Sequence, residues 1–316
     1  MTEPMVLGLF LVSGMVAGFA FQRSRLCFVG SLRDLFLFGD TGMTRGALQL
    51  LGLVAVFGAT AVAWRPGMQL TGPGALDTLL GGGLFGVGMV LAGSCASGAF
   101  WRLGEGQGSQ LWILLGLLAG TWLWALFPLG GELLAQAPLS PWLSALIIGL
   151  LLLAVSLWER TRPARGEELP PLHHERGAWR RPWPPILGAV VIAAALAGFL
   201  AATGLTWRLT SMFLLSDAAG ALFGLGLVGG GHLSARVGRE WRLRGAGRPR
   251  EGLLRLAGGL LMGYGARLGG GCTIGALLSS MVTSSGQAWF WFAGAVVGAW
   301  IGSRVLRRLM TGLFSV

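Results

Sequence analysis

Runs of mainly apolar residues, separated by short polar or arginine-bearing stretches, recur along the whole chain. A helix that crosses a bilayer needs about 20 such residues, and several of the runs reach that length. The pattern therefore predicts an all-α polytopic membrane protein. We expect nine crossings, at residues 5–22, 44–64, 77–100, 110–127, 141–158, 184–202, 211–232, 251–283 and 287–303.

The composition agrees with a membrane protein. Hydrophobic residues make up 53% of the chain and charged residues only 12%, whereas a soluble domain carries about 25% charge. The net charge of +11 does not indicate nucleic-acid binding, because the arginines lie in short loops between apolar runs. We expect a single membrane transport domain over 1–316, with a first half at 1–158, an arginine-rich linker at 159–183 and a second half at 184–316.

The arginines also predict an orientation, because basic residues collect in cytoplasmic loops. Arginines are frequent at 159–183, at 236–255 and in the C-terminal tail, whereas 128–140 has none. We therefore place the linker and the C-terminus in the cytoplasm and the N-terminus outside, which requires an odd number of crossings.

Two glycine-rich segments repeat one another. Residues 79–99 (LLGGGLFGVGMVLAGSCASGA) and 256–276 (LAGGLLMGYGARLGGGCTIGA) share eleven of 21 positions when Cys95 is set over Cys272. In the predicted topology they run in opposite directions, so the two halves form an inverted repeat about a pseudo-two-fold axis in the membrane plane. Their glycines predict broken or re-entrant helices near the midplane. Apolar segments of this kind, recurring in both halves, indicate a transport site.

The repeated cysteines and their neighbours are therefore the candidate substrate path. A free cysteine in an apolar segment is usually a small packing residue, but two at equivalent positions favour a function. We expect neutral thiols that act as weak hydrogen-bond donors. The path residues that we predict from the repeat are Cys95, Cys272, Gly93, Gly98, Gly270, Gly271, Gly275 and Arg267.

For Arg267, substrate binding and extension of its side chain to the membrane surface are equally good interpretations. Glu105 and Asp217 are interpreted as helix caps. A third unusual segment, 18–34, carries Cys27 and reads as a re-entrant or interfacial piece; 204–213 is its nearest counterpart in the second half and lacks a cysteine. No cofactor or metal site is expected.

Three segments together resemble a known family. RSRLCFVGSLRD, GVGMVLAGSCASGAFWRLGEG and GYGARLGGGCTIGA are similar to the signature segments of the YeeE/YedE sulphur-transport family. The resemblance implies nine membrane spans with short non-spanning helices in the bacterial inner membrane. It implies that Cys27, Cys95 and Cys272 line a path for thiosulfate or a similar reduced sulphur anion. A TusA-type cytoplasmic sulphur carrier is an implied partner.

Other functions stay open at this point. A selenium or other sulphur species could be the substrate within the same family. A membrane-bound thiol enzyme, such as a sulphurtransferase, would need a base near an activated thiolate, and no histidine lies near a cysteine in the sequence. A scaffold subunit would have no need of repeated cysteines between glycines. We therefore expect a transporter and not an enzyme.

Overall fold

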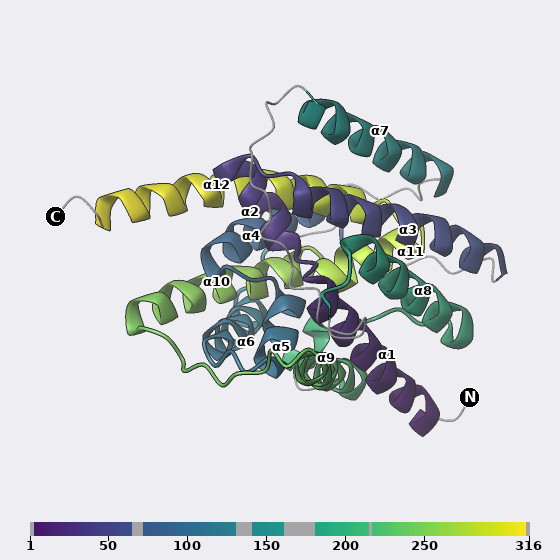
Figure 1. The fold of residues 1–316 in the computed structure, drawn as a ribbon, viewed down its shortest axis with the longest axis horizontal. Helices are drawn as coiled ribbons and strands as arrows, with labels where there is room; N and C mark the ends of the chain where they lie inside the picture. The colour runs from purple at the N-terminus through teal and green to yellow at the C-terminus, as the bar shows by residue number, and fades with distance from the viewer. Residues whose placement is uncertain (1–2, 65–71, 131–140, 161–180, 215–216, 314–316) are drawn as a thin grey trace.

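The computed structural model describes residues 3–64, 72–130, 141–160, 181–214 and 217–313, and these are helices joined by short connections (Figure 1). The first half contains α1 (Glu3–Ser24), α2 (Phe28–Phe38), α3 (Gly42–Trp64), α4 (Ala75–Ala92), α5 (Ala96–Gly104), α6 (Gln110–Leu126) and α7 (Pro141–Arg160). The second half contains α8 (Pro185–Thr203), the 3-10 turn η2 (Thr210–Leu214), α9 (Ala218–Val237), α10 (Pro249–Leu268), the π-helical η3 (Thr273–Ser279), α11 (Ser280–Val282) and α12 (Gln287–Leu313).

The chain is an all-helical, multi-pass membrane protein. Among the described residues, six helical stretches are long and apolar enough to cross a bilayer: Glu3–Phe38, Gly42–Val62, Ala75–Gly104, Pro185–Thr203, Ala218–Val237 and Gln287–Leu309. The other three predicted crossings correspond to α6, α7 and α10. The described parts of these helices are too short or too highly charged to count among the six. For α10 the reason is charge, because four of its residues are arginine or glutamate. Nine crossings therefore stay a prediction.

The glycine-rich repeats are broken helices, as their sequences predict. The first copy divides at Gly93 into α4 and the short helix α5, and the second divides at Gly269–Cys272 into α10 and η3. Two predicted boundaries are wrong. The helix expected at 211–232 begins only at Ala218, because Asp217 caps it and accepts a hydrogen bond from the Ala219 amide at 3.1 Å. The helix expected at 287–303 continues to Leu313.

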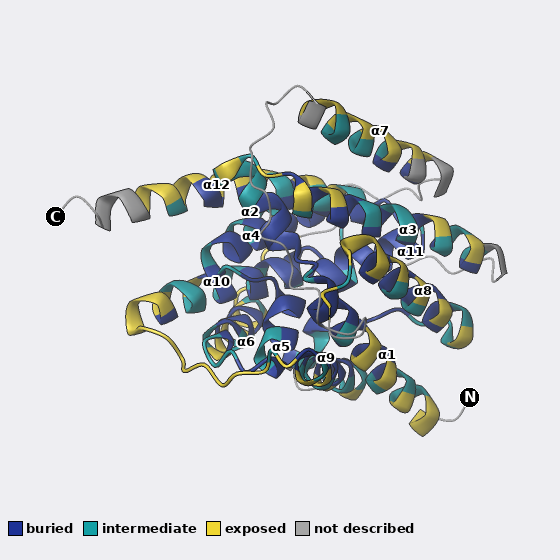
Figure 2. Cartoon of the chain, in the orientation of Figure 1, coloured by how far each residue is buried: buried dark blue, intermediate teal, exposed yellow. Residues whose placement is uncertain are grey.

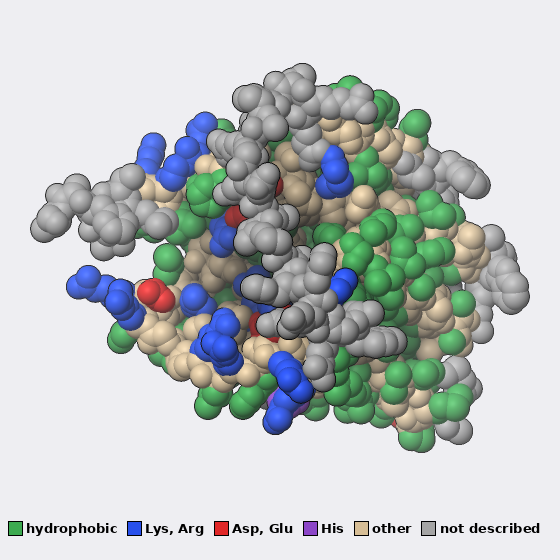
Figure 3. All heavy atoms as spheres, in the orientation of Figure 1, with side chains coloured by type: hydrophobic (Ala, Val, Ile, Leu, Met, Phe, Trp, Pro, Cys, Tyr) green, Lys and Arg blue, Asp and Glu red, His purple; other side chains and the backbone are tan. Residues whose placement is uncertain are grey.

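The buried residues occupy the centre of the bundle, where α4, α5, α10 and η3 meet (Figure 2). Apolar side chains also face outward, as they do on helices that contact lipid; Leu146, Leu150 and Leu153 of α7 are examples. The two termini lie at opposite ends of the molecule (Figure 1). Figure 3 shows arginine side chains gathered at the end where α10 begins and α12 finishes, whereas apolar side chains dominate the face over α8 and α3.

Candidate functional site

Each of the three cysteines is the residue immediately before a short internal helix. Cys27 precedes α2, Cys95 precedes α5 and Cys272 precedes η3. All three are buried and free of disulfides. The first amides of a helix have no partner within it and carry partial positive charge, and the Gly98 amide donates to the Cys95 sulphur at 3.4 Å. The cysteines therefore lie where backbone geometry favours an anion.

Cys27 and Cys95 form one group. Their side chains lie near each other, and Arg102 of α5 contacts Cys27 through Nη2 at 3.4 Å. Nη1 of the same guanidinium donates to the Gly93 carbonyl oxygen at 3.0 Å. Arg102 thus joins the first cysteine segment to the glycine that ends α4, although these residues lie far apart in the sequence.

Cys272 forms a second group with the other half of the chain. Its side chain lies near that of Thr210, the residue at which η2 begins. Thr210 thus occupies the same position relative to Cys272 that Cys27 occupies relative to Cys95. The helices that follow the repeat cysteines, α5 and η3, also contact each other. The two groups are therefore neighbours in the middle of the bundle.

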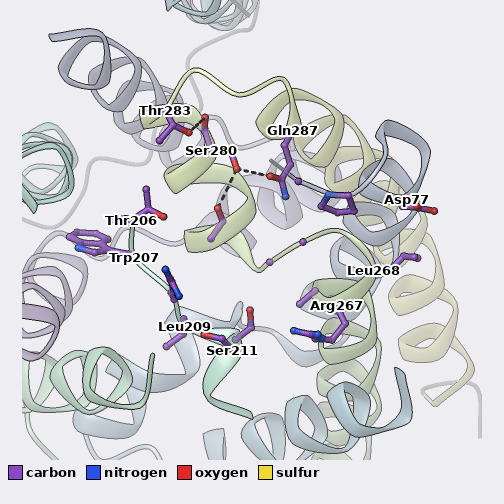
Figure 4. Close-up of a pocket in the computed structure, with 18 of the residues that line it drawn as sticks. Asp77, Thr206, Trp207, Leu209, Ser211, Arg267, Leu268, Ser280, Thr283 and Gln287 are labelled. Atoms are coloured by element: carbon purple, nitrogen blue, oxygen red, sulfur yellow. Dashed lines mark hydrogen bonds between the residues drawn. The ribbon is translucent and has the colours of Figure 1, made fainter. Parts of the chain in front are cut away.

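A cavity of about 770 Å³ opens beside the Cys272 group (Figure 4). Its walls come from the broken segments, with Gly204–Ser211 between α8 and η2 on one side and the end of α10 with η3 on the other. Four of the predicted path residues line it: Arg267, Gly270, Gly271 and Gly275. None of the three cysteines is part of its wall, and neither are Gly93 and Gly98.

The predicted glycines have different roles around this cavity. Gly93, Gly270 and Gly271 have positive φ angles of 71°, 76° and 149°, which side chains rarely allow, so they form the breaks that place the cysteines. Gly275 has open space where a side chain would begin, as expected of a residue on a cavity wall. Gly98 supplies the amide that faces Cys95.

Arg267 points into the cavity from α10 (Figure 4). Its guanidinium lies over the Trp124 ring, 4.9 Å from the ring centre, and its buried Nε has no hydrogen-bond partner among the described residues. A buried guanidinium donor without a partner is costly unless a ligand or water satisfies it. Arg267 therefore brings a donor that is unpartnered in the described part of the chain to the wall of the cavity.

A polar cluster that includes Arg25, two residues before Cys27, was missed from the sequence. Arg25 pairs with Glu105 at 2.6 Å and with Glu240 at 2.8 Å, and the Gln22 amide donates to the same two carboxylates. We call Gln22, Arg25, Glu105 and Glu240 the inner cluster. Glu105 is the residue that caps the C-terminus of α5, and its buried carboxylate is in addition an ion-pair partner of Arg25. Asp217 was correctly identified as a cap.

Arg102, Arg208 and Thr210 were also missed. The sequence did contain a signal for Arg208 and Thr210. The tripeptide Arg208-Leu209-Thr210 repeats Arg25-Leu26-Cys27 with threonine in place of cysteine. Among the described residues no group of three or more histidine, cysteine, aspartate or glutamate side chains could hold a metal ion.

Comparison with known protein sequences found a matching family and several similar proteins. The profile of the family described as "Sulphur transport" matches residues 23–301. The chain is 28% identical to the thiosulfate transporter TsuA of Escherichia coli, over 93% of this chain and 92% of that protein. It is 29% identical to TsuA of Spirochaeta thermophila, over 94% and 98%. A probable transporter of E. coli, YedE, is 32% identical over 36% of this chain and 28% of its own length. Because the family match spans most of the chain, including all three cysteine segments, this protein belongs to the sulphur transport family.

Proposed function

We propose that the chain takes up thiosulfate, or a closely related reduced sulphur anion, along a path lined by Cys272, Cys95 and Cys27. The observation that carries the proposal is the placement of all three buried cysteines at the starts of short helices in the centre of the bundle. The names of the two relatives that match nearly the whole chain support thiosulfate as the substrate.

The path begins in the cavity, where Arg267 attracts the anion, and leads to Cys272 and Thr210. It continues to Cys95 and Cys27. Helix amides supply most of the attraction for negative charge. The thiols are weak donors, and weak contacts at successive positions let an ion enter and leave. No covalent bond to the substrate forms in this scheme.

Helix packing supports an inverted repeat. The packing of α4 against α12 is matched by that of α10 against α6, and the packing of α1 against α9 is matched by that of α8 against α3. The crossing of α4 and α10 is reciprocal. Gly81 approaches the Gly265 carbonyl and Gly258 approaches the Gly88 carbonyl, each so closely that an added methyl carbon would lie 2.6 Å from the oxygen. The symmetry operation that exchanges the two halves therefore converts the Gly81–Gly265 contact into the Gly258–Gly88 contact.

We further propose nine crossings, an N-terminus outside and a C-terminus in the cytoplasm of a bacterial inner membrane. The arginines at the end of α12 and the start of α10 support this orientation (Figure 3). It places the cavity on the outer side and the inner cluster on the cytoplasmic side. Residues 1–316 then form one transport domain with halves at 1–158 and 184–316 and a cytoplasmic linker at 159–183. A TusA-type carrier is the proposed cytoplasmic acceptor.

The test of the function is uptake of labelled thiosulfate into proteoliposomes that contain the purified protein. We expect saturable uptake well above that of protein-free liposomes. Uptake equal to that of the protein-free control would contradict the proposal. Release of altered sulphur species without net uptake would instead indicate a thiol enzyme.

A further inference from the structure

Arg208 lies on the cavity wall in the non-helical segment between α8 and η2. Its neighbours Trp207 and Leu209 are each only 1% exposed, whereas Arg208 itself is exposed. Buried neighbours on both sides fix the backbone at this point. The guanidinium is therefore presented to the cavity from a rigid segment, which suits a binding residue.

The charges around Arg208 leave it available to an anion. Ion pairs among the described residues involve Arg25 and Arg33, and Arg208 is in none of them. Asp217, the acidic residue next along the chain, is engaged by the Ser211 hydroxyl at 2.5 Å and by the Ala219 amide. The described cavity wall carries Arg208 and Arg267 against one carboxylate, Asp77, so positive charge is in excess.

The pseudo-equivalent position in the other half shows what such an arginine binds. Arg25 lies two residues before Cys27, which is near Cys95, and Arg208 lies two residues before Thr210, which is near Cys272. Arg25 binds two carboxylate oxygens, one from Glu105 and one from Glu240. In the first half, the carboxylates of Glu105 and Glu240 occupy the space beside Arg25. In the second half, the corresponding space beside Arg208 is the cavity.

Membrane topology does not account for Arg208. In the proposed orientation both Arg208 and Arg267 are on the outer side, where the positive-inside rule disfavours arginine. A planar guanidinium matches two oxygens of one anion through parallel N–H bonds. We propose that Arg208 binds the oxygen-bearing end of a small dianion in the cavity, before the anion reaches Cys272. This inference rests on the proposed transport function and adds a specific binding residue to it.

The test compares Arg208→Gln and Arg208→Lys with Arg250→Gln, which removes a charge from an exposed arginine at the start of α10. For each variant, the thiosulfate concentration at half-maximal uptake is measured in proteoliposomes. The rise in unfolding midpoint that thiosulfate produces is measured in detergent. We expect Arg208→Gln to raise the half-maximal concentration about tenfold, equivalent to ~1.4 kcal/mol, with the maximal rate within twofold. Arg208→Lys should show a smaller rise and Arg250→Gln none.

The outcomes separate this inference from the function itself. A half-maximal concentration for Arg208→Gln within twofold of the unaltered protein would overturn the role of Arg208, while wild-type uptake still supports transport. A fall in maximal rate alone would also overturn it, because a binding residue acts on the half-maximal concentration. If the unaltered protein takes up no thiosulfate, the function fails, and the midpoint shift still decides whether Arg208 binds the anion.

Discussion

Arg25, two residues before Cys27, forms a 2.6 Å ion pair with Glu105. The Glu105 side chain is 4% exposed, whereas that of Arg25 is 42% exposed. The Ser234 hydroxyl donates a hydrogen bond to the Gln22 side-chain oxygen at 2.5 Å, and the Gln22 side-chain nitrogen donates one to the Glu105 carboxylate. In the proposed orientation this cluster lies on the cytoplasmic side and the cavity lies on the outer side.

If the inner cluster closes the cytoplasmic end of the proposed path, Glu105→Gln should weaken it by removing one of the two carboxylate charges that pair with Arg25. We expect a severalfold faster reaction of Cys27 and Cys95 with a charged thiol reagent applied to the cytoplasmic side of inside-out vesicles. The matched control is Glu251→Gln, an exposed carboxylate in the first turn of α10. Equal labelling rates in Glu105→Gln and the control would contradict a closing role. Because Arg25 is partly exposed, we expect a loss of stability of only about 1–2 kcal/mol.

Gly270 and Gly93 are repeat-equivalent, and both adopt positive φ angles. A methyl group on Gly270 would lie 2.6 Å from Pro73 Cδ and would also clash with the Gln287 amide, whereas Gly93 has open space there. Gly93→Ala should therefore cost only the left-handed backbone, about 1–2 kcal/mol. Gly270→Ala should cost a further 1–3 kcal/mol or so through overpacking. The unfolding midpoints of the two variants in detergent measure these losses of stability. Equal midpoints for Gly93→Ala and Gly270→Ala would contradict the packing described around Gly270.

Topology can be tested with reporters. A reporter fused after Val316 should be active only in the cytoplasm, and one inserted at Gly131 should be active only outside, because the arginine distribution places these points on opposite sides. Reporter activity in whole cells measures both fusions. Finding the two reporters on the same side of the membrane would remove the inverted relationship between the halves.

Sulfate provides a test of selectivity. Sulfate and thiosulfate share charge and tetrahedral shape, but thiosulfate has one polarizable sulphur that gives up hydration more easily and suits contact with S–H groups. Tenfold molar excess of sulfate should therefore reduce thiosulfate uptake only slightly, and each factor of ten in preference corresponds to ~1.4 kcal/mol. Competition by sulfate equal to that by unlabelled thiosulfate would show that the thiols do not set selectivity. Chloride at matched ionic strength controls for charge screening.

Local patterns in the sequence predicted the helices and their breaks well. The long apolar runs gave α1, α3 and α8 to within about two residues, because apolar length alone defines a crossing helix. The glycines gave the breaks before Cys95 and Cys272, because only glycine readily adopts the required backbone angles.

Contacts between distant segments could not be predicted in the same way. The approach of Arg102 to Cys27 joins residues 75 positions apart, and that of Gln22 to Glu240 joins residues 218 apart. Hydropathy carries no information about which helices become neighbours. The equivalence of Cys27 and Thr210 was obscured because threonine replaces cysteine, although both can donate a weak or ordinary hydrogen bond from the same place.

The most direct test of the cysteine path is thiosulfate uptake by Cys95→Ala and Cys272→Ala, with Cys→Ser at each position. Both alanine variants remove a buried donor while changing side-chain volume little, so the proteins should insert and fold. We predict at least a tenfold loss of uptake rate in each alanine variant and partial recovery in the serine variants, which keep a donor but lose the sulphur. Uptake at the unaltered rate in both alanine variants, at equal protein in the liposomes, would show that these cysteines are packing residues and would contradict the path proposed here.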